Sequence, residues 1–203
     1  MRRIVFGVLF AMVFSVNAAF AADNSAGAKA YVDNVAKQAV GIIAQTREGT
    51  LTADQAKQNF RKILNSSFDI PTIAKFTLGR YWRVATPAQQ TEYTQLLQTT
   101  ILDKYADNML ESAGEKYTLN AARAINDRDY SVDMTGYSKE GQSVAFGWRL
   151  REANGAFKVI DIAVEGVSMS VTHRSDFASV IERNGGQVQS LLDALKNKEF
   201  SKK

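Results

Sequence analysis

The chain has 203 residues, 25 Lys and Arg against 21 Asp and Glu, and a formal net charge of +4 at pH 7. It has no cysteine, which excludes disulfides, thiolate metal sites, a cysteine nucleophile and a lipid-modified N-terminal cysteine. The charge excess is too small to indicate nucleic-acid binding, and the length suits one domain whose 45% hydrophobic residues can form a core.

Residues 1–21 have the pattern of a cleavable secretory signal. Two arginines precede an apolar run at 4–16, and the small-residue tripeptide at 19–21 is typical of a cleavage site. The apolar run is too short for a membrane anchor, and no later stretch is long enough to span a bilayer. We therefore expect residues 22–203 to form one exported, soluble domain that is not an integral membrane protein.

The first half of the remaining chain has helical patterning. Apolar residues recur at helical spacing over 28–43, and Thr52 with Gln55 forms a capping-box pattern that begins a second helix. A short helix is expected between Pro71 and Gly79, and a long helix from the capping residue Thr86 to Gly114.

After Tyr117 the hydrophobic period changes from 3.6 to 2, which predicts a sheet. Each of the two later connections ends in Gly, and both are interpreted as three-residue hairpin loops with Gly in the left-handed conformation. The expected strands cover 117–126, 129–138, 142–151 and 156–166, and the two loops are 139–141 and 153–155.

These loops fix a register that places the apolar residues on one face. A two-residue Asn-Gly turn would instead pair Trp148 with Asp161 and turn the last strand's apolar residues to the wrong face. The register sets Val144, Phe146 and Trp148 opposite Gly136, Met134 and Val132 on one side and Val164, Ile162 and Ile160 on the other. The other face, with Asp133, Thr135, Arg149, Asp161 and Glu165, is expected to be solvated.

Two more helices are expected at the C-terminus, at 175–183 and 187–197, with Ser175 and Asp176 capping the first of them. The predicted fold class is α+β: a four-stranded antiparallel meander sheet wrapped by about six helices in a single domain.

The segment EGVSMSVTHRSDF, residues 165–177, contains the only histidine, His173, among three serines. No Gly-x-Ser-x-Gly motif is present, so a surface or capping role for His173 is favoured over a catalytic triad. One histidine and no cysteine predict no metal site. The apolar face has no Asp or Glu for acid–base chemistry, and the residues alone leave open a filled core or a lipid-sized cavity.

Four segments resemble the MlaC family of periplasmic phospholipid-binding proteins, also called the toluene-tolerance auxiliary family. They are LGRYWRVATPAQQTEY at 78–93, LLQTTILDKYADNML at 96–110, the Phe-x-Trp pair at 146–148, and FKVIDIAVEGVSMS at 157–170. The Glu-Gly-Val-Ser element at 165–168 is the most specific of these features.

The resemblance implies an NTF2-like, MlaC-like fold around an apolar cavity, and a non-enzymatic periplasmic carrier without cofactor. The carrier would pass lipid between an outer-membrane lipoprotein complex and an inner-membrane ABC transporter with an MCE-domain protein, maintaining outer-membrane lipid asymmetry. Because 177–198 also resembles the hopanoid-associated branch, a hopanoid-type lipid is an alternative cargo to phospholipid.

Apolar residues that would line such a cavity share a place on the sheet's apolar face or on the helices expected to cover it. Three arginines are candidates for a headgroup or partner contact, although solvated arginines are equally expected. The lining candidates are Phe76, Tyr81, Trp82, Leu97, Ile101, Tyr105, Met134, Val144, Phe146, Trp148, Ile160, Ile162, Val164, Val167 and Met169, and the arginines are Arg80, Arg83 and Arg174.

Overall fold

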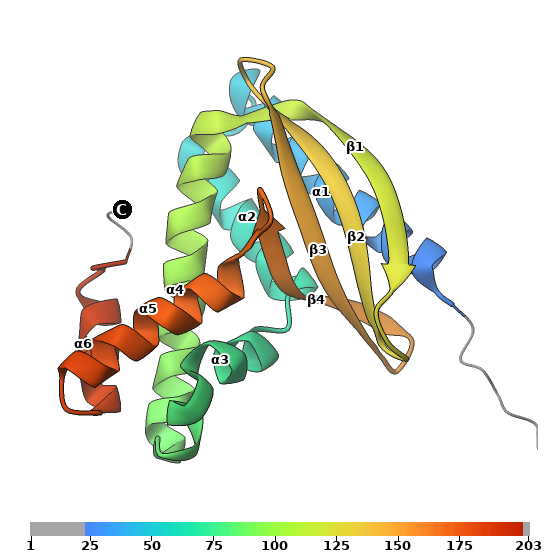
Figure 1. Cartoon of the computed structure of the whole chain (residues 1–203). Coiled ribbons are helices and arrows are strands. Elements are labelled where there is room, and N and C mark those ends of the chain that lie inside the picture. The colour runs from blue at the N-terminus through green and yellow to red at the C-terminus, as the bar shows by residue number, and fades with distance from the viewer. Residues whose placement is uncertain (1–22, 201–203) are drawn as a thin grey trace, which may run out of the picture.

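Helices and one antiparallel sheet make up the computed structural model, which describes residues 23–200 apart from the side chains of residues 102, 103 and 107 (Figure 1). The predicted secretory signal at 1–21 lies outside the described residues. The strand order is β1-β2-β3-β4-β5, so every strand pairs with its neighbour in sequence. The α+β meander is therefore confirmed, with one short strand more than predicted.

The helices of the first half begin where their capping residues predict. Thr52 and Thr86 each accept a backbone hydrogen bond from the glutamine three residues later, and each glutamine side chain bonds back to the capping residue's N–H. Gly79, with φ of 57°, ends the short helix as expected. The elements are α1 (Ser25–Arg47), α2 (Ala53–Ser67), α3 (Ile70–Leu78), the 3₁₀ helix η1 (Gly79–Arg83) and α4 (Pro87–Ser112).

The sheet begins earlier than predicted, because Gly114 lies inside the first strand and does not end the preceding helix. The short fifth strand follows a two-residue turn at Glu165 and Gly166, both in the left-handed region with φ of 51° and 78°. The strands are β1 (Ala113–Ala124), β2 (Asp129–Ser138), β3 (Ser143–Ala153), β4 (Ala156–Val164) and β5 (Val167–Ser168).

The register between β2 and β3 is the predicted one. Val132 lies opposite Trp148, and Met134 lies opposite Phe146. The three-residue loop before Gln142 holds Gly141 with φ of 84°, as its glycine predicted.

The register between β3 and β4 differs from the prediction. Ala153 pairs with Ala156 across a two-residue turn, whose residues Asn154 and Gly155 have φ of 54° and 73°. A β-bulge then leaves Ile160 without a partner, so that Trp148 lies opposite Ile162 rather than Ile160. The tight turn moves the register by one residue and the bulge moves it by one more, so Ile162 and Val164 keep their predicted face, whereas Val159 takes the apolar position predicted for Ile160.

Helices cover the apolar face of the sheet in two groups. In Figure 1 α1 runs behind β1 and β2, whereas α3 and α5 contact β4, and α4 packs on α2, α3 and α6. A first core joins the sheet to α1 and α2, and a second core lies among α3, α4, α5 and α6. No helix in the described part of the chain is both long and apolar enough to cross a bilayer.

The two C-terminal helices are α5 (Met169–Arg183) and α6 (Val188–Lys196). The expected start of the first at Ser175 is wrong, because Ser168 caps it by accepting a hydrogen bond from the N–H of Val171 at 3.1 Å. Ser168 itself was the available signal, a serine placed directly before a run that can be helical. His173 consequently lies within a helix and not at a strand-to-helix junction.

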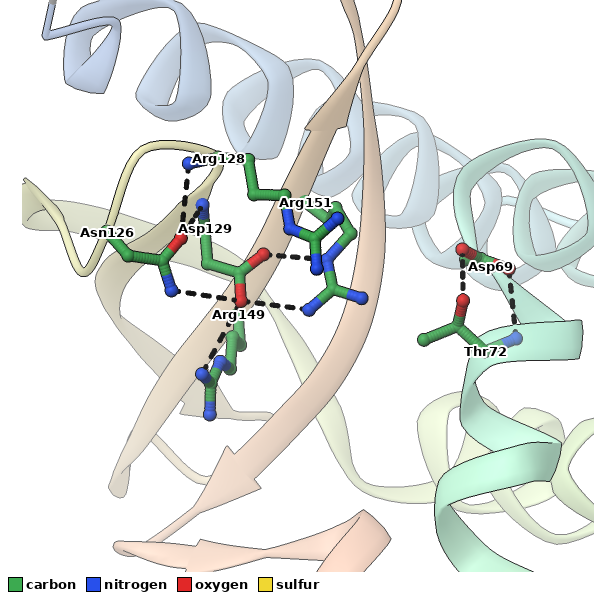
Figure 2. A network of polar contacts seen from close by, with 7 residues as sticks. All are labelled: Asp69, Thr72, Asn126, Arg128, Asp129, Arg149 and Arg151. Atoms are coloured by element: carbon green, nitrogen blue, oxygen red, sulfur yellow. Dashed lines mark hydrogen bonds and ion pairs between the residues drawn. The ribbon is translucent and has the colours of Figure 1, made fainter. Parts of the chain in front are cut away.

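A buried carboxylate holds the turn between β1 and β2 to the third strand (Figure 2). Asp129 is 3% exposed and accepts hydrogen bonds from Arg151 at 2.7 Å and 2.9 Å. Asn126 accepts from the N–H of Asp129 at 2.9 Å, and Arg149 lies 3.6 Å from the same carboxylate. The hydrogen bonds from Arg151 lower the pKa of Asp129 below its ordinary value. In the same figure Asp69 caps α3 through Thr72.

We expect Asp129→Asn to lower the free energy of unfolding by about 3 kcal/mol, because it leaves a guanidinium beside a buried position without its charge partner. Asp133→Asn is the matched control, since its pair with Arg123 is exposed and worth less than about 1 kcal/mol. Urea unfolding of both variants measures the difference. The gap between wild type and Asp129→Asn should narrow as the pH falls below about 4, because the carboxyl group of the unfolded chain is protonated there before that of the folded chain. Equal losses in both variants would contradict a special role for Asp129.

Candidate functional site

The apolar face of the sheet is closed at one end and partly open at the other. Near the Asp129 turn its side chains are inaccessible to solvent, because α1 and α2 pack on them. Toward the β4–β5 turn the side chains on the same face are only half-buried. The closed end contains Val132, Leu150 and Val159, and the half-open stretch contains Val144, Phe146, Ile162 and Val164.

Two side chains lie between these ends. Trp148 and Met134 are each 8% exposed and belong to the core that joins the sheet to α1 and α2. Phe146 covers Gly136 on the neighbouring strand, where a Cβ atom would approach the ring to 2.8 Å. The glycine therefore lets the aromatic ring lie flat on the sheet at the boundary of the half-open stretch.

The start of α5 lies beside β4 at this end of the sheet, and Tyr105 of α4 contacts it. Tyr105 and Met169 are half-buried, and the Tyr105 hydroxyl lies 3.3 Å from both Met169 Sδ and His173 Nε2. Asp161 fixes the start of α5, since its carboxylate accepts from the Ser168 hydroxyl at 2.5 Å and from the N–H of Ser170 at 3.0 Å. An anion at a helix N-terminus thus sets the position of Met169 and His173 next to the sheet.

His173 is buried, so the expected surface or capping position is wrong. Its ring stacks on Phe177 with the centroids 5.3 Å apart, and among the described residues its Nδ1 has no hydrogen-bond partner. Burial, with a smaller effect of the nearby Lys104, lowers the pKa of the imidazole below its ordinary 6.5. The imidazole of His173 contacts Tyr105, whereas the Ser168 hydroxyl donates to Asp161. Ser168 and His173 therefore do not form a nucleophile–base pair.

The predicted lining residues fall into separate groups. Those of the sheet share one face, and four helical residues lie in the second core. Two others are exposed, and one is the unpaired residue of the bulge. Whether any of them contacts a ligand stays a prediction. The sheet group is Met134, Val144, Phe146, Trp148, Ile162 and Val164; the second core contains Tyr81, Trp82, Leu97 and Ile101; Phe76 and Val167 are exposed, Ile160 is the bulge residue, and Tyr105 and Met169 lie at the α4–α5 contact.

The three arginine candidates all lie on the helical part of the molecule. Arg80 contacts Glu182 at 2.6 Å and the Tyr81 hydroxyl at 2.8 Å. Arg174 lies over the ring of Phe76, 5.1 Å from its centroid, and Arg83 is exposed at the end of η1. None of the three is among the residues of the sheet's apolar face.

The opposite face of the sheet carries a hollow of about 450 Å³ that the sequence analysis did not predict. Small residues on β3, Ala145 and Gly147, form part of its lining, and this alternation of small side chains was the available signal. Arg123 and Asp133 form an ion pair at its side, 2.8 Å apart. This polar face agrees with the expected solvated surface, except that Asp161 is engaged in capping α5. Among the described residues, no group of three or more potential ligands could hold a metal ion.

These features define the class of the protein as an α+β domain in which helices close part of one apolar sheet face and leave the rest half-open. The chain belongs to the MlaC protein family, whose model matches residues 33–197. The family resemblance of the four sequence segments is thereby confirmed.

Two known proteins are similar to this chain. Over 133 residues it is 26% identical to the toluene tolerance protein ttg2D of Pseudomonas putida, and the aligned part covers 65% of this chain and 62% of that relative. A solved structure of a phospholipid-binding protein from Ralstonia solanacearum, in complex with a phospholipid, superimposes with a TM-score of 0.70 at 25% identity. The match covers 87% of this chain and 97% of the Ralstonia chain, so the fold extends over nearly all of both.

We expect acidification to destabilise the protein through His173. Because folding holds the imidazole pKa below 6.5, the unfolded chain binds more protons below about pH 7, and stability falls as the pH decreases. The positive charge of Lys104 also lowers the pKa of His173, whereas the carboxylates of Asp161 and Asp176 raise it. The remaining polar neighbour, Tyr105, is uncharged.

His173→Phe keeps a ring against Phe177 and removes this titration. Between pH 7.5 and pH 5, the free energy of unfolding of wild type should fall relative to that of the variant by up to about 1.4 kcal/mol per pH unit. Denaturant unfolding across this range measures the gap. A gap that does not change with pH would show that the imidazole is not held neutral by the fold.

Proposed function

We propose that the protein is a lipid carrier that holds phospholipid acyl chains against the half-open apolar stretch of its sheet. The observation that carries the proposal is the change along one sheet face from side chains fully buried by α1 and α2 to the half-buried Val144, Phe146, Ile162 and Val164. The half-buried Tyr105 and Met169 border this stretch. The similar Ralstonia protein, solved with a phospholipid, supports the same class of ligand.

The binding energy of such a carrier comes from the acyl chains. Each buried methylene leaves water with a gain of about 0.8 kcal/mol, so a chain of ordinary length binds without a charged anchor. None of the residues of β2 and β3 on the apolar face is charged. They are Val132, Met134, Gly136, Val144, Phe146, Trp148 and Leu150. The headgroup would stay in water, and broad tolerance of different headgroups follows.

The finer parts of the proposal concern location and partners. We propose export to the periplasm through the signal at 1–21, and transfer of lipid between an outer-membrane lipoprotein complex and an inner-membrane ABC transporter with an MCE-domain protein. This transfer would maintain the lipid asymmetry of the outer membrane. A hopanoid-type lipid suits the same apolar face, and the mass of the lipid that co-purifies with the protein separates the two cargoes.

Loading and release require access to the apolar face. The contact between α4 and α5 near this face includes the 3.3 Å distance from the Tyr105 hydroxyl to His173 Nε2, which is long for a hydrogen bond to nitrogen. We propose that these helices separate when lipid enters, and that a partner with its own apolar surface competes for the acyl chains.

We expect Phe146→Arg to abolish lipid uptake from vesicles, with affinity lower by at least about 100-fold, because a guanidinium in the acyl-chain site lacks a charge partner. Ala145→Arg is the matched control: it adds the same side chain at the next position of β3, on the exposed polar face. Native mass spectrometry after incubation with phospholipid vesicles measures uptake, and circular dichroism verifies folding. Equal uptake by the two folded variants would contradict binding on the apolar face.

We expect no hydrolysis of phospholipid esters by the wild type. The buried His173 contacts Tyr105, and no serine hydroxyl in residues 23–200 is recorded as its hydrogen-bond partner. Fatty-acid release from labelled phospholipid should equal the background for wild type and for His173→Ala. Release that requires His173 would replace the carrier with an esterase.

A further inference from the structure

The indole N–H of Trp148 has no hydrogen-bond acceptor among the described residues, and its nitrogen is inaccessible to solvent. Two buried tyrosines, in contrast, have polar partners: the Tyr93 hydroxyl lies 2.7 Å from the Thr77 hydroxyl, and the Tyr81 hydroxyl accepts from Arg80 at 2.8 Å. Trp148 is therefore an exception to the rule that buried donors are satisfied.

The residues around Trp148 explain why no acceptor is near. Its cross-strand neighbours are Val132 and Ile162, and the same-face residues along its own strand are Phe146 and Leu150. All four are apolar. An unsatisfied buried donor is destabilising, and phenylalanine at this position would fill similar space without that cost.

We infer that the Trp148 N–H donates a hydrogen bond to an ester carbonyl of the bound lipid; this inference rests on the proposed carrier function. The acceptor is neutral, because a phosphate oxygen beside Trp148 would bury a negative charge on a face without cations. Arg149, the nearest arginine in sequence, points to the opposite face, where it pairs with Asp129.

The place of Trp148 in the sheet suits this contact. It lies where the closed core ends, next to the half-buried Phe146 and Ile162. Beyond β4 at this level lie α3 and α5. A glycerol backbone at Trp148 would have its acyl chains on the half-open stretch, toward the β4–β5 turn.

Comparison of a diacyl phosphatidylglycerol with its dialkyl ether analogue tests the inference, since the two lipids differ at the carbonyl groups. In the wild-type protein, labelled with ¹⁵N at the indoles, the Trp148 N–H proton resonance should move downfield with the diester lipid and not with the diether. Trp82→Phe assigns the two indole signals. Equal movement with both lipids would overturn the inference and indicate a water or other acceptor.

Affinity supplies the second measurement. Trp148→Phe should weaken binding of the diester lipid by about fivefold and leave binding of the diether unchanged, as expected for one neutral hydrogen bond. An equal change for both lipids would overturn the inference while leaving the carrier function intact. If wild type takes up neither lipid, the proposed function itself fails. Should Trp148→Phe not fold, the resonance measurement on the wild type decides.

Discussion

The β-bulge at Ile160 is the constraint on which the site depends. The tight Asn154–Gly155 turn alone would set Trp148 opposite Asp161 and place a carboxylate among the apolar residues of the sheet. Burial of that charge without a cation would cost far more than the turn gains. One extra residue in β4 corrects the alternation, so that Ile162 and Val164 join the apolar face. The half-open stretch therefore exists because the bulge allows the two-residue turn while keeping the apolar residues of β4 on the apolar face.

The same bulge determines where the fifth helix begins. Asp161, directed to the polar face, accepts hydrogen bonds from Ser168 and from the N–H of Ser170 and so stabilises the first turn of α5. With its start fixed there, the helix carries Met169 and His173 against Tyr105 on α4. The polar and apolar faces of the sheet are thus coupled: a carboxylate on one face positions the side chains that border the other.

Local signals predicted most of the fold, and long-range effects account for the differences. The capping boxes at Thr52 and Thr86 and the loop before Gln142 involve only neighbouring residues, so the sequence is sufficient to identify them. The predicted β3–β4 register was wrong because the shifts caused by the two-residue turn and by the bulge leave the alternation of Ile162 and Val164 unchanged. Counting alternating residues cannot distinguish this arrangement from a three-residue loop without a bulge. The start of α5 has a local signal in Ser168 but is also stabilised by Asp161 of β4, and the burial of His173 depends on packing against Tyr105 of α4. Family resemblance suggested the lipid, while the division of the lining residues between two cores was visible only in three dimensions.

The charged residues of the sheet lie on one face and the apolar residues on the other, which suits the proposed binding of acyl chains without a charged anchor. Arg123, Asp133 and Arg149 lie on the polar face, where they pair with one another or with Asp129, so they offer no strong charge to hold a headgroup. In the proposed carrier, the affinity for lipid would then scale with the number of buried methylene groups, and it would be lost gradually as the acyl chains move onto another apolar surface. A charged anchor would have to break before the lipid leaves, which adds a barrier at the step of delivery. In the proposed carrier, a single neutral donor such as the Trp148 N–H would fix the orientation of the lipid and contribute little to the barrier for its release.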